Sequence, residues 1–293
     1  MDITPRKFAG MPLKIETAEG IGFCFGVRRA INILEKAARE HGGIETLGAI
    51  VHNQPVLDRL VGIGVRLAGS VDDIQGNSVV ISAHGVNPQT EQRLRARHIS
   101  LIDTTCPFVR RAQRVAHRLA SAGFFVIIYG DASHPEVQGV LGWANDRGLA
   151  TLDERAVTRL KPLPRRLGVL SQTTEIPAHF SEFAGKLVSH ALGKDSELRL
   201  VDTICHDIRQ RQALARELAC HVGLMLVIGG HNSANTTRLA QLCSEVTTTY
   251  LIETAAEVQA SWFKGQNQVG ITAGASTAAE TVAAVIARLK TIN

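Results

Sequence analysis

Three cysteines occupy equivalent places along the chain, and together they could hold a metal ion or a metal cluster. Cys106 and Cys205 end the related phrases Asp-Thr-Thr-Cys and Asp-Thr-Ile-Cys, and Cys24 lies within Gly-Phe-Cys-Phe-Gly. Each follows an apolar run typical of a strand and precedes residues with helical spacing of apolar positions. Because a helix N-terminus favours a thiolate, all three places suit metal ligation. Three protein ligands leave one position open, as catalytic metal centres require.

The cysteines also define a threefold internal repeat, in which polar residues recur at fixed distances. The residue 28 positions after each cysteine is polar, and another polar group follows the next predicted strand. Since ligands bind at the carboxyl ends of parallel strands, we expect these residues to converge. A single histidine of this kind would more often be structural. As a set, imidazoles, hydroxyls and helix N-termini favour a phosphate or diphosphate site. The members are His52, His84, His134, Ser233, Asn235 and Ser276.

Glu136 is one of the few carboxylates in the predicted loops. It follows His134 and Pro135 at the expected start of a helix, where an acidic residue commonly has a capping role. Within a ring of phosphate-binding groups, burial and nearby anions would instead raise the pKa of its carboxyl. Such a group could donate a proton in a reaction. Both interpretations stay open at this point.

The repeat predicts the fold as well as the site. Strands alternate with helices in each repeat, which indicates an α/β protein with parallel sheets. We expect three similar small α/β units at residues 13–105, 106–204 and 205–293, after a flexible leader at 1–12. Each unit is near the lower end of domain sizes, so the three should pack together around one centre.

Composition narrows the possible functions. Aromatic residues make up only 4% of the 293 residues, which argues against the base-stacking platforms of nucleic-acid-binding proteins. The net charge of +5 is modest and suits an anionic substrate or an acidic partner as well as a nucleic acid. No apolar run is long enough to span a membrane, and residues 1–12 lack the apolar core of a signal peptide. Five widely spaced cysteines do not form a disulfide framework, so we expect a reducing, cytoplasmic location.

The motifs as a set resemble the hydroxymethylbutenyl diphosphate reductases, the last enzymes of the non-mevalonate isoprenoid pathway. The resemblance runs from about residue 13 to residue 290, with the motifs in family order. The matching segments are Gly22–Val27, Val51–Asn53, Ser82–Val86, Asp103–Pro107, His134–Val137, Gln172–Thr174, Ile204–Cys205, Asn232–Asn235 and Thr272–Ser276.

The resemblance implies a trefoil of three α/β domains around one [4Fe-4S] cluster held by Cys24, Cys106 and Cys205. It implies that Thr173 contacts the hydroxyl of the substrate and that Glu136 relays protons as water leaves. Reduced ferredoxin or flavodoxin would supply two electrons, and the products would be isopentenyl and dimethylallyl diphosphates. The residues implied to hold the substrate diphosphate are His52, His84, His134, Ser233, Asn235 and Ser276.

Two positions depart from the family pattern. Ala234 stands where family members usually have the second serine of Asn-Ser-Ser-Asn, and Ile208 replaces the usual threonine three residues after the last cysteine. These changes motivate an alternative, a paralogue that uses the same cluster on another hydroxylated, anionic substrate. A third possibility is an iron–sulfur sensor without enzymatic activity. The presence of Glu136 and Thr173 speaks against the sensor, which needs neither.

Overall fold

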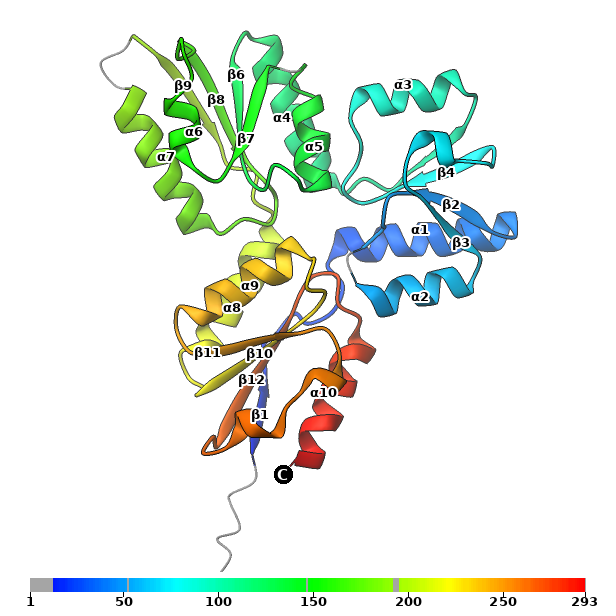
Figure 1. Ribbon diagram of the computed structural model, residues 1–293, viewed down its shortest axis with the longest axis vertical. Helices are drawn as coiled ribbons and strands as arrows, with labels where there is room; N and C mark the ends of the chain where they lie inside the picture. Colours follow the sequence, from blue (N-terminus) through cyan, green and yellow to red (C-terminus); the bar gives the residue numbers. More distant parts are fainter. Residues whose placement is uncertain (1–12, 52, 146, 192–194, 293) are drawn as a thin grey trace, which may run out of the picture.

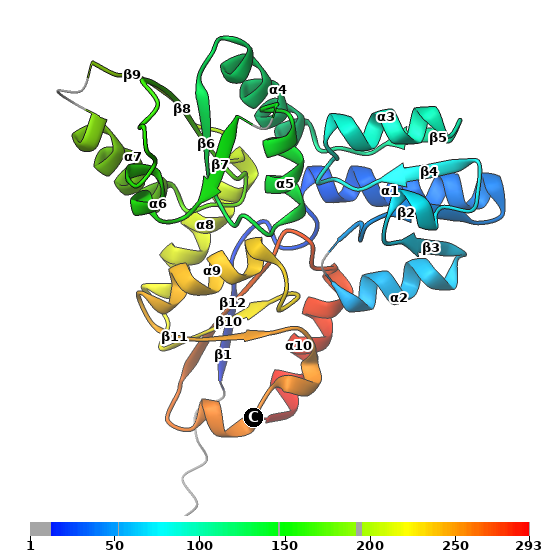
Figure 2. The same ribbon diagram turned by 45° about the horizontal axis from the view of Figure 1, so that its top comes forward.

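The computed structural model describes residues 13–51, 53–145, 147–191 and 195–292. Within these ranges the chain forms three sheets, each of four parallel strands. Figure 1 and the turned view in Figure 2 show three units of sheet and helices arranged around a common centre. The predicted fold class, an α/β protein of three similar units with parallel sheets, is confirmed.

The first sheet has the strand order β3-β2-β4-β5. Its central strand β4 is buried on both faces, as expected for a parallel sheet covered by helices on two sides. Val80 packs against α1 and α2, whereas Val79 and Ile81 pack on the other face with Leu94 of α3. The elements are β2 (Ile44–Leu47), β3 (Val65–Ala68), β4 (Ser78–Ile81), β5 (Ser100–Asp103), α1 (Phe25–His41), α2 (Gln54–Gly62) and α3 (Pro88–Ala96).

The second sheet repeats this plan with the order β7-β6-β8-β9. Its central strand β6 places Val126 and Ile128 against α4 and α5, and Ile127 and Tyr129 against α6 and α7. The elements are β6 (Phe125–Tyr129), β7 (Gly148–Thr151), β8 (Arg166–Ser171), β9 (Glu197–Val201), α4 (Pro107–Ser121), α5 (Pro135–Gly142), α6 (Glu154–Thr158) and α7 (Pro177–Ala191).

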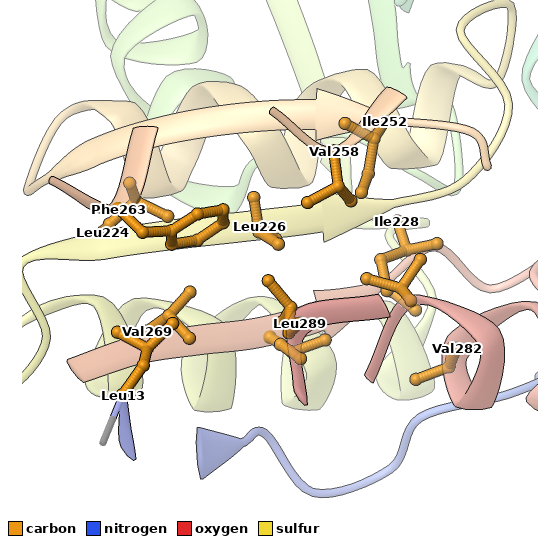
Figure 3. Packing of buried hydrophobic residues seen from close by; sticks show 13 residues of the cluster. Leu13, Leu224, Leu226, Ile228, Ile252, Val258, Phe263, Val269, Val282 and Leu289 are labelled. Atoms are coloured by element: carbon orange, nitrogen blue, oxygen red, sulfur yellow. The ribbon is translucent and has the colours of Figure 1, made fainter. Parts of the chain in front are cut away.

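The third sheet has the order β1-β12-β10-β11. Leu226 and Ile228 of its central strand pack with Leu289 of α10, as Figure 3 shows. Met225 and Val227 face α8 and α9 on the other side. The elements are β1 (Lys14–Thr17), β10 (Leu224–Ile228), β11 (Thr248–Ile252), β12 (Gln268–Ala273), α8 (His206–Ala219), α9 (Ala234–Ser244) and α10 (Ala279–Ile292).

The placement of the first strand corrects the predicted unit boundaries. We assigned residues 13–17 to the first unit, but β1 pairs with β12 from Lys14 opposite Gln268 to Thr17 opposite Ile271. In Figure 1 this blue strand lies in the same unit as the orange and red elements. The physical reason lies in the repeat itself: each strand that leads into a cysteine completes the sheet of the preceding unit. The unit that precedes Cys24 in the ring is the third one.

Three edge strands, one in each described sheet, were not predicted, namely β3, β7 and β11. Each is only four or five residues long and partly exposed. None of the helices in the described ranges has both the length and the apolar character needed to cross a membrane.

Candidate active site

The three cysteines stand at the same structural position in the three units. Each is the N-cap residue of the helix that follows, namely α1, α4 and α8. One backbone hydrogen bond repeats at all three corners, because each cysteine N–H donates to the carbonyl two residues beyond the end of a neighbouring strand. The pairs are Cys24 with Ala275, Cys106 with Ala83 and Cys205 with Thr173, at 2.9, 3.0 and 2.9 Å. The sheet edges therefore fix the direction in which each helix begins.

The three corners meet at one cavity of about 100 Å³, which Cys24, Cys106 and Cys205 all line. Gly26 leaves room between them: a Cβ at this position would lie 2.6 Å from the Cys106 sulfur and 4.0 Å from the Cys24 sulfur. Ile208 packs in the same apolar group as Cys205. The chain thus brings together three thiols that are about a hundred residues apart in sequence.

The surroundings of these thiols suit an iron–sulfur cluster. Burial raises the pKa of Cys106, and it raises the pKa of Cys205 to about 11, while backbone N–H groups at the starts of α4 and α8 act in the opposite direction. The N–H donors stabilise the thiolates, and a cation that displaces the thiol protons compensates for the cost of burying the charge. Within the described ranges, no group of three or more His, Cys, Asp or Glu side chains could hold a single metal ion. A cluster instead binds each cysteine through a separate iron.

Arg211 connects the chain segment before Cys24 to α8, the helix that begins after Cys205. Its guanidinium, on α8, donates to the carbonyls of Gly22 and Ala273 at 2.9 Å each. The side chain is only 8% exposed, and burial lowers the pKa of Arg211 despite the nearby Cys24 and Asp207. A buried cation that holds the Cys24 loop against α8 positions this thiol relative to Cys205.

Glu136 and Thr173 form a tightly bound pair in the wall of the cavity. The carboxylate is 2% exposed, with one oxygen accepting from the Thr173 backbone N–H at 2.7 Å and the other from the Thr173 hydroxyl at 2.8 Å. Burial raises the pKa of Glu136 to about 7, against the two hydrogen bonds from Thr173, and Glu175 adds to the rise. A carboxyl with this pKa can both give and take a proton near neutral pH.

Two histidines stand beside this pair. His134 is the N-cap of α5, and its Nδ1 accepts from the backbone N–H of Glu136 at 3.1 Å. A neutral imidazole that accepts at Nδ1 carries its proton at Nε2, where it can donate. The ring of His84 lies edge-on to that of His134, with centroids 5.2 Å apart. Both histidines line the cavity.

The third unit contributes hydrogen-bond donors that lack partners. Ser233, Asn235 and Ser276 are each at most 8% exposed and line the cavity. Among the described residues, neither the Asn235 side-chain nitrogen nor the Ser276 hydroxyl has a hydrogen-bond partner. Buried polar groups are almost always paired, so unpaired donors at a cavity indicate a ligand that would accept from them.

His52 lies outside the described residues, although its neighbours Val51 and Asn53 are described. Val51 lines the cavity, and Asn53 caps α2 by accepting from the Val56 N–H at 3.2 Å. The structure therefore brings together every predicted site residue that it describes.

A match to a protein-family model relates this chain to known proteins. The model described as LytB protein matches residues 15–290. The chain belongs to the LytB family. The expected resemblance to this family is confirmed.

Named relatives of this LytB family member cover nearly its whole length. A protein of Dehalococcoides mccartyi strain CBDB1, named 4-hydroxy-3-methylbut-2-enyl diphosphate reductase, is 57% identical over 277 residues, which are 94% of this chain and 98% of that protein. A Geobacter sulfurreducens protein of the same name is 41% identical over 279 residues, 95% of this chain and 97% of that protein.

Solved structures show the same fold. The structure described as (E)-4-hydroxy-3-methyl-but-2-enyl diphosphate reductase, the terminal enzyme of the non-mevalonate pathway, is 35% identical. It has a TM-score of 0.68 and covers 95% of this chain and 99% of that chain. The Plasmodium falciparum reductase of this kind has a TM-score of 0.86 at 23% identity, covering 94% and 87% of the two chains.

Sequence reasoning missed several residues of the candidate site. Thr174 lines the cavity with a buried hydroxyl that has no hydrogen-bond partner in the described part of the chain. Phe108 lines the cavity next to the cysteines. Thr174 follows a predicted strand end and could have been included on that ground. Nothing in the local sequence distinguishes Arg211 from the solvent-exposed arginines of the same helix.

Proposed function

We propose that this protein reduces 4-hydroxy-3-methylbut-2-enyl diphosphate to isopentenyl and dimethylallyl diphosphates, the last step of the non-mevalonate pathway. The names of its relatives support this reaction. The observation that carries the proposal is the enclosed pair of Glu136 and Thr173 beside three convergent cysteines. A redox centre, an acid and an anion site in one cavity are what a reductive dehydroxylation of a diphosphate needs.

Cys24, Cys106 and Cys205 would hold one [4Fe-4S] cluster per chain. When bound, the cluster supplies the electrons of the reaction and an iron with an open position. The three thiols fit this group because they line one cavity and pack against apolar side chains, and because Cys106 and Cys205 face backbone N–H groups of helix starts. Arg211 would keep the Cys24 loop in place through its two carbonyl contacts.

The substrate diphosphate would be bound by polar side chains that line the cavity. Asn235 and Ser276 offer an amide and a hydroxyl, and His134 offers its Nε2 proton. Ser233 and His84 line the same cavity, and His52 is proposed to join them. A hydrogen bond to a charged group contributes about 1.5–3 kcal/mol, so four or five such bonds suffice for tight binding.

Glu136 would supply the proton that leaves with the substrate hydroxyl as water. Its carboxyl is about half protonated near neutral pH, because burial raises its pKa to about 7. Thr173 lies 2.8 Å from the carboxylate, so its hydroxyl can pass a proton between Glu136 and a group in the cavity. The second hydrogen bond, from the Thr173 N–H, holds the carboxylate in this orientation.

The electrons would come from a reduced ferredoxin or flavodoxin, in a reducing cytoplasmic setting. We expect the reaction to run without this protein donor when a reduced viologen replaces it, since a small reductant needs no docking surface.

An anaerobic assay tests the proposal. The protein is purified under anaerobic conditions, its iron and sulfide are measured, and 4-hydroxy-3-methylbut-2-enyl diphosphate is added with reduced viologen. We expect turnover by the wild type and by Ala234→Ser, and almost none by Glu136→Gln. A cluster-loaded protein that stays inactive until Ala234→Ser is introduced would mean that the cavity accepts a different hydroxylated anion. Loaded protein that is inactive in every form would overturn the proposed reaction.

A further inference from the structure

The helices that begin at the three cysteines present a second repeated pattern, on the side away from the cavity. The second and third residues after the first two cysteines line the cavity, namely Gly26 and Val27 on α1 and Phe108 and Val109 on α4, and on α8 the third residue, Ile208, does so. The first and fourth residues do not. Since successive helical residues are about 100° apart, positions 1, 4 and 5 share the opposite face.

An arginine occupies the fourth position in all three units, as Arg28, Arg110 and Arg209. In the second and third units it forms an ion pair with the aspartate three residues before the cysteine, Asp103 or Asp202. In the first unit the corresponding residue is Ile21, so Arg28 has no aspartate at this position with which to form an ion pair. Its guanidinium donates to the Phe23 carbonyl at 3.2 Å.

The face formed by positions 1, 4 and 5 is therefore positively charged near Cys24 and Cys106. Arg28 and Arg111 are both exposed, and no ion pair within the described ranges involves either one. Arg29 reaches across from α1 to the Thr104 and Thr105 carbonyls of the second corner at 3.2 and 3.4 Å, so the starts of α1 and α4 form one continuous surface.

A large apolar side chain lies within this charged surface. Phe25, the first residue after Cys24, is 57% exposed. The first residues after the other two cysteines, Pro107 and His206, are exposed as well. An exposed aromatic residue three positions before an exposed arginine, Arg28, on the same helix has the composition of an interface centre, where aromatic and arginine side chains contribute most of the binding energy.

We propose that this face, formed by Phe25, Arg28, Pro107, Arg111 and His206, is the docking surface for an acidic protein that donates electrons. The proposal rests on the proposed function, which needs two electrons and two protons to convert one substrate molecule to product and water. Each docking event passes one electron from the reduced iron–sulfur or flavin group of the donor to the cluster. The face is chosen by position and charge: Phe25, Pro107 and His206 directly follow the cysteines, and its exposed arginines, which form no ion pair within the described ranges, complement an acidic partner.

The test compares a protein donor with a small reductant. Phe25→Ala and the double variant Arg28→Glu, Arg111→Glu are loaded with cluster, and turnover is driven either by photoreduced flavodoxin or by reduced viologen. We expect kcat/KM for flavodoxin to fall about tenfold and to lose most of its salt dependence, with viologen-driven turnover unchanged. Glutamate suits the first turns of α1 and α4, because it complements the helix dipole, so the variants should fold.

Binding gives a readout that is independent of turnover. The Kd of oxidised flavodoxin for the loaded protein should rise about tenfold in the same variants. Arg39→Glu is the matched control, since it makes the same change on α1 eleven residues further along, about 16 Å away. It should leave both flavodoxin affinity and flavodoxin-driven turnover unchanged.

Three results would overturn the docking surface: unchanged flavodoxin affinity in the double variant, an equal loss with Arg39→Glu, or a loss of binding to a short DNA duplex with flavodoxin binding intact. The last result would assign the face to nucleic acid instead. A wild type that fails with viologen would overturn the proposed reaction, and flavodoxin binding would still decide the role of the face.

Discussion

The second and third units place different chemistry at the same point of their folds. In each, the residue 28 positions after the cysteine caps the helix that follows the central strand. His134 accepts the Glu136 N–H at 3.1 Å, and Ser233 accepts the Thr236 N–H at 3.4 Å. Around His134 the polar groups are paired with one another, most tightly in Glu136 and Thr173. Around Ser233 they include Asn235, whose amide nitrogen has no partner in the described ranges.

In the proposed reaction this difference separates two tasks within one cavity. Burial raises the pKa of the Glu136 carboxyl, so the second unit would exchange a proton. Donors without partners in the described ranges would bind an anion, which would be the contribution of the third unit. The helix-capping position thus keeps its structural role in both units, and the neighbouring residues decide the chemistry.

The largest expected effect follows from removing the acid of the second unit. Glu136→Gln preserves the shape of the side chain but removes the exchangeable proton, so we expect kcat to fall about a thousandfold with little change in KM. Steady-state kinetics with reduced viologen measures both parameters. Iron and sulfide content serves as the control and should equal that of the wild type. A mainly raised KM would place Glu136 among the anion-binding groups and remove the contrast between the units.

The next largest expected effect concerns an ion pair that links the second and third units. Glu175, two residues after Thr173, forms a bidentate ion pair with Arg238 of α9, at 2.9 and 3.0 Å. The Glu175 side chain is only 1% exposed, so Arg238→Met would leave a buried, unpaired carboxylate and destabilise the fold by about 3 kcal/mol. Urea unfolding measures the loss. The double variant Glu175→Leu, Arg238→Met should recover most of it, and no recovery would contradict this account.

A pH-dependent effect of similar or smaller size follows from the raised pKa of Glu136. A carboxyl whose pKa rises from 4.5 to about 7 on folding stabilises the folded state fully below its unfolded pKa, and this contribution is lost as the pH rises through 7. The cluster-free wild type should therefore lose up to about 3 kcal/mol relative to Glu136→Gln between about pH 4 and about pH 8. Urea unfolding of both proteins across this range measures the difference. A stability difference that does not change with pH would show that the Glu136 carboxyl has the same pKa in the folded and unfolded states.

The smallest of these effects tests the third unit. Asn235→Ala removes a donor that would contact a charged ligand, so we expect KM to rise about thirtyfold with kcat nearly unchanged. The matched control is Asn232→Ala, three residues earlier, which is exposed and does not line the cavity. If Asn235→Ala lowered kcat instead, the third unit would share the role that we assign to Glu136.

Much of the fold and of the candidate site could be predicted because the repeated motifs mark residues that are far apart in the sequence but equivalent in the three units. Related motifs at equivalent strand-to-helix corners grouped Cys24, Cys106 and Cys205, and the 28-residue spacing and the strand ends then located the polar residues. Edge strands such as β7 escaped prediction since short, half-exposed strands have little apolar alternation. Arg211 escaped because its role depends on the carbonyls of Gly22 and Ala273, which only the folded chain brings near it.

The pairing of β1 with β12 has a consequence for how the chain folds during synthesis. β1 is synthesised about 250 residues before its partner strand β12. Because chain closure over such a separation is slow, we expect this edge of the third sheet to form late in folding. Cys24 follows β1, so its thiol reaches the other two only when the three units come together. The three thiols therefore meet in one cavity only after β12 has been synthesised.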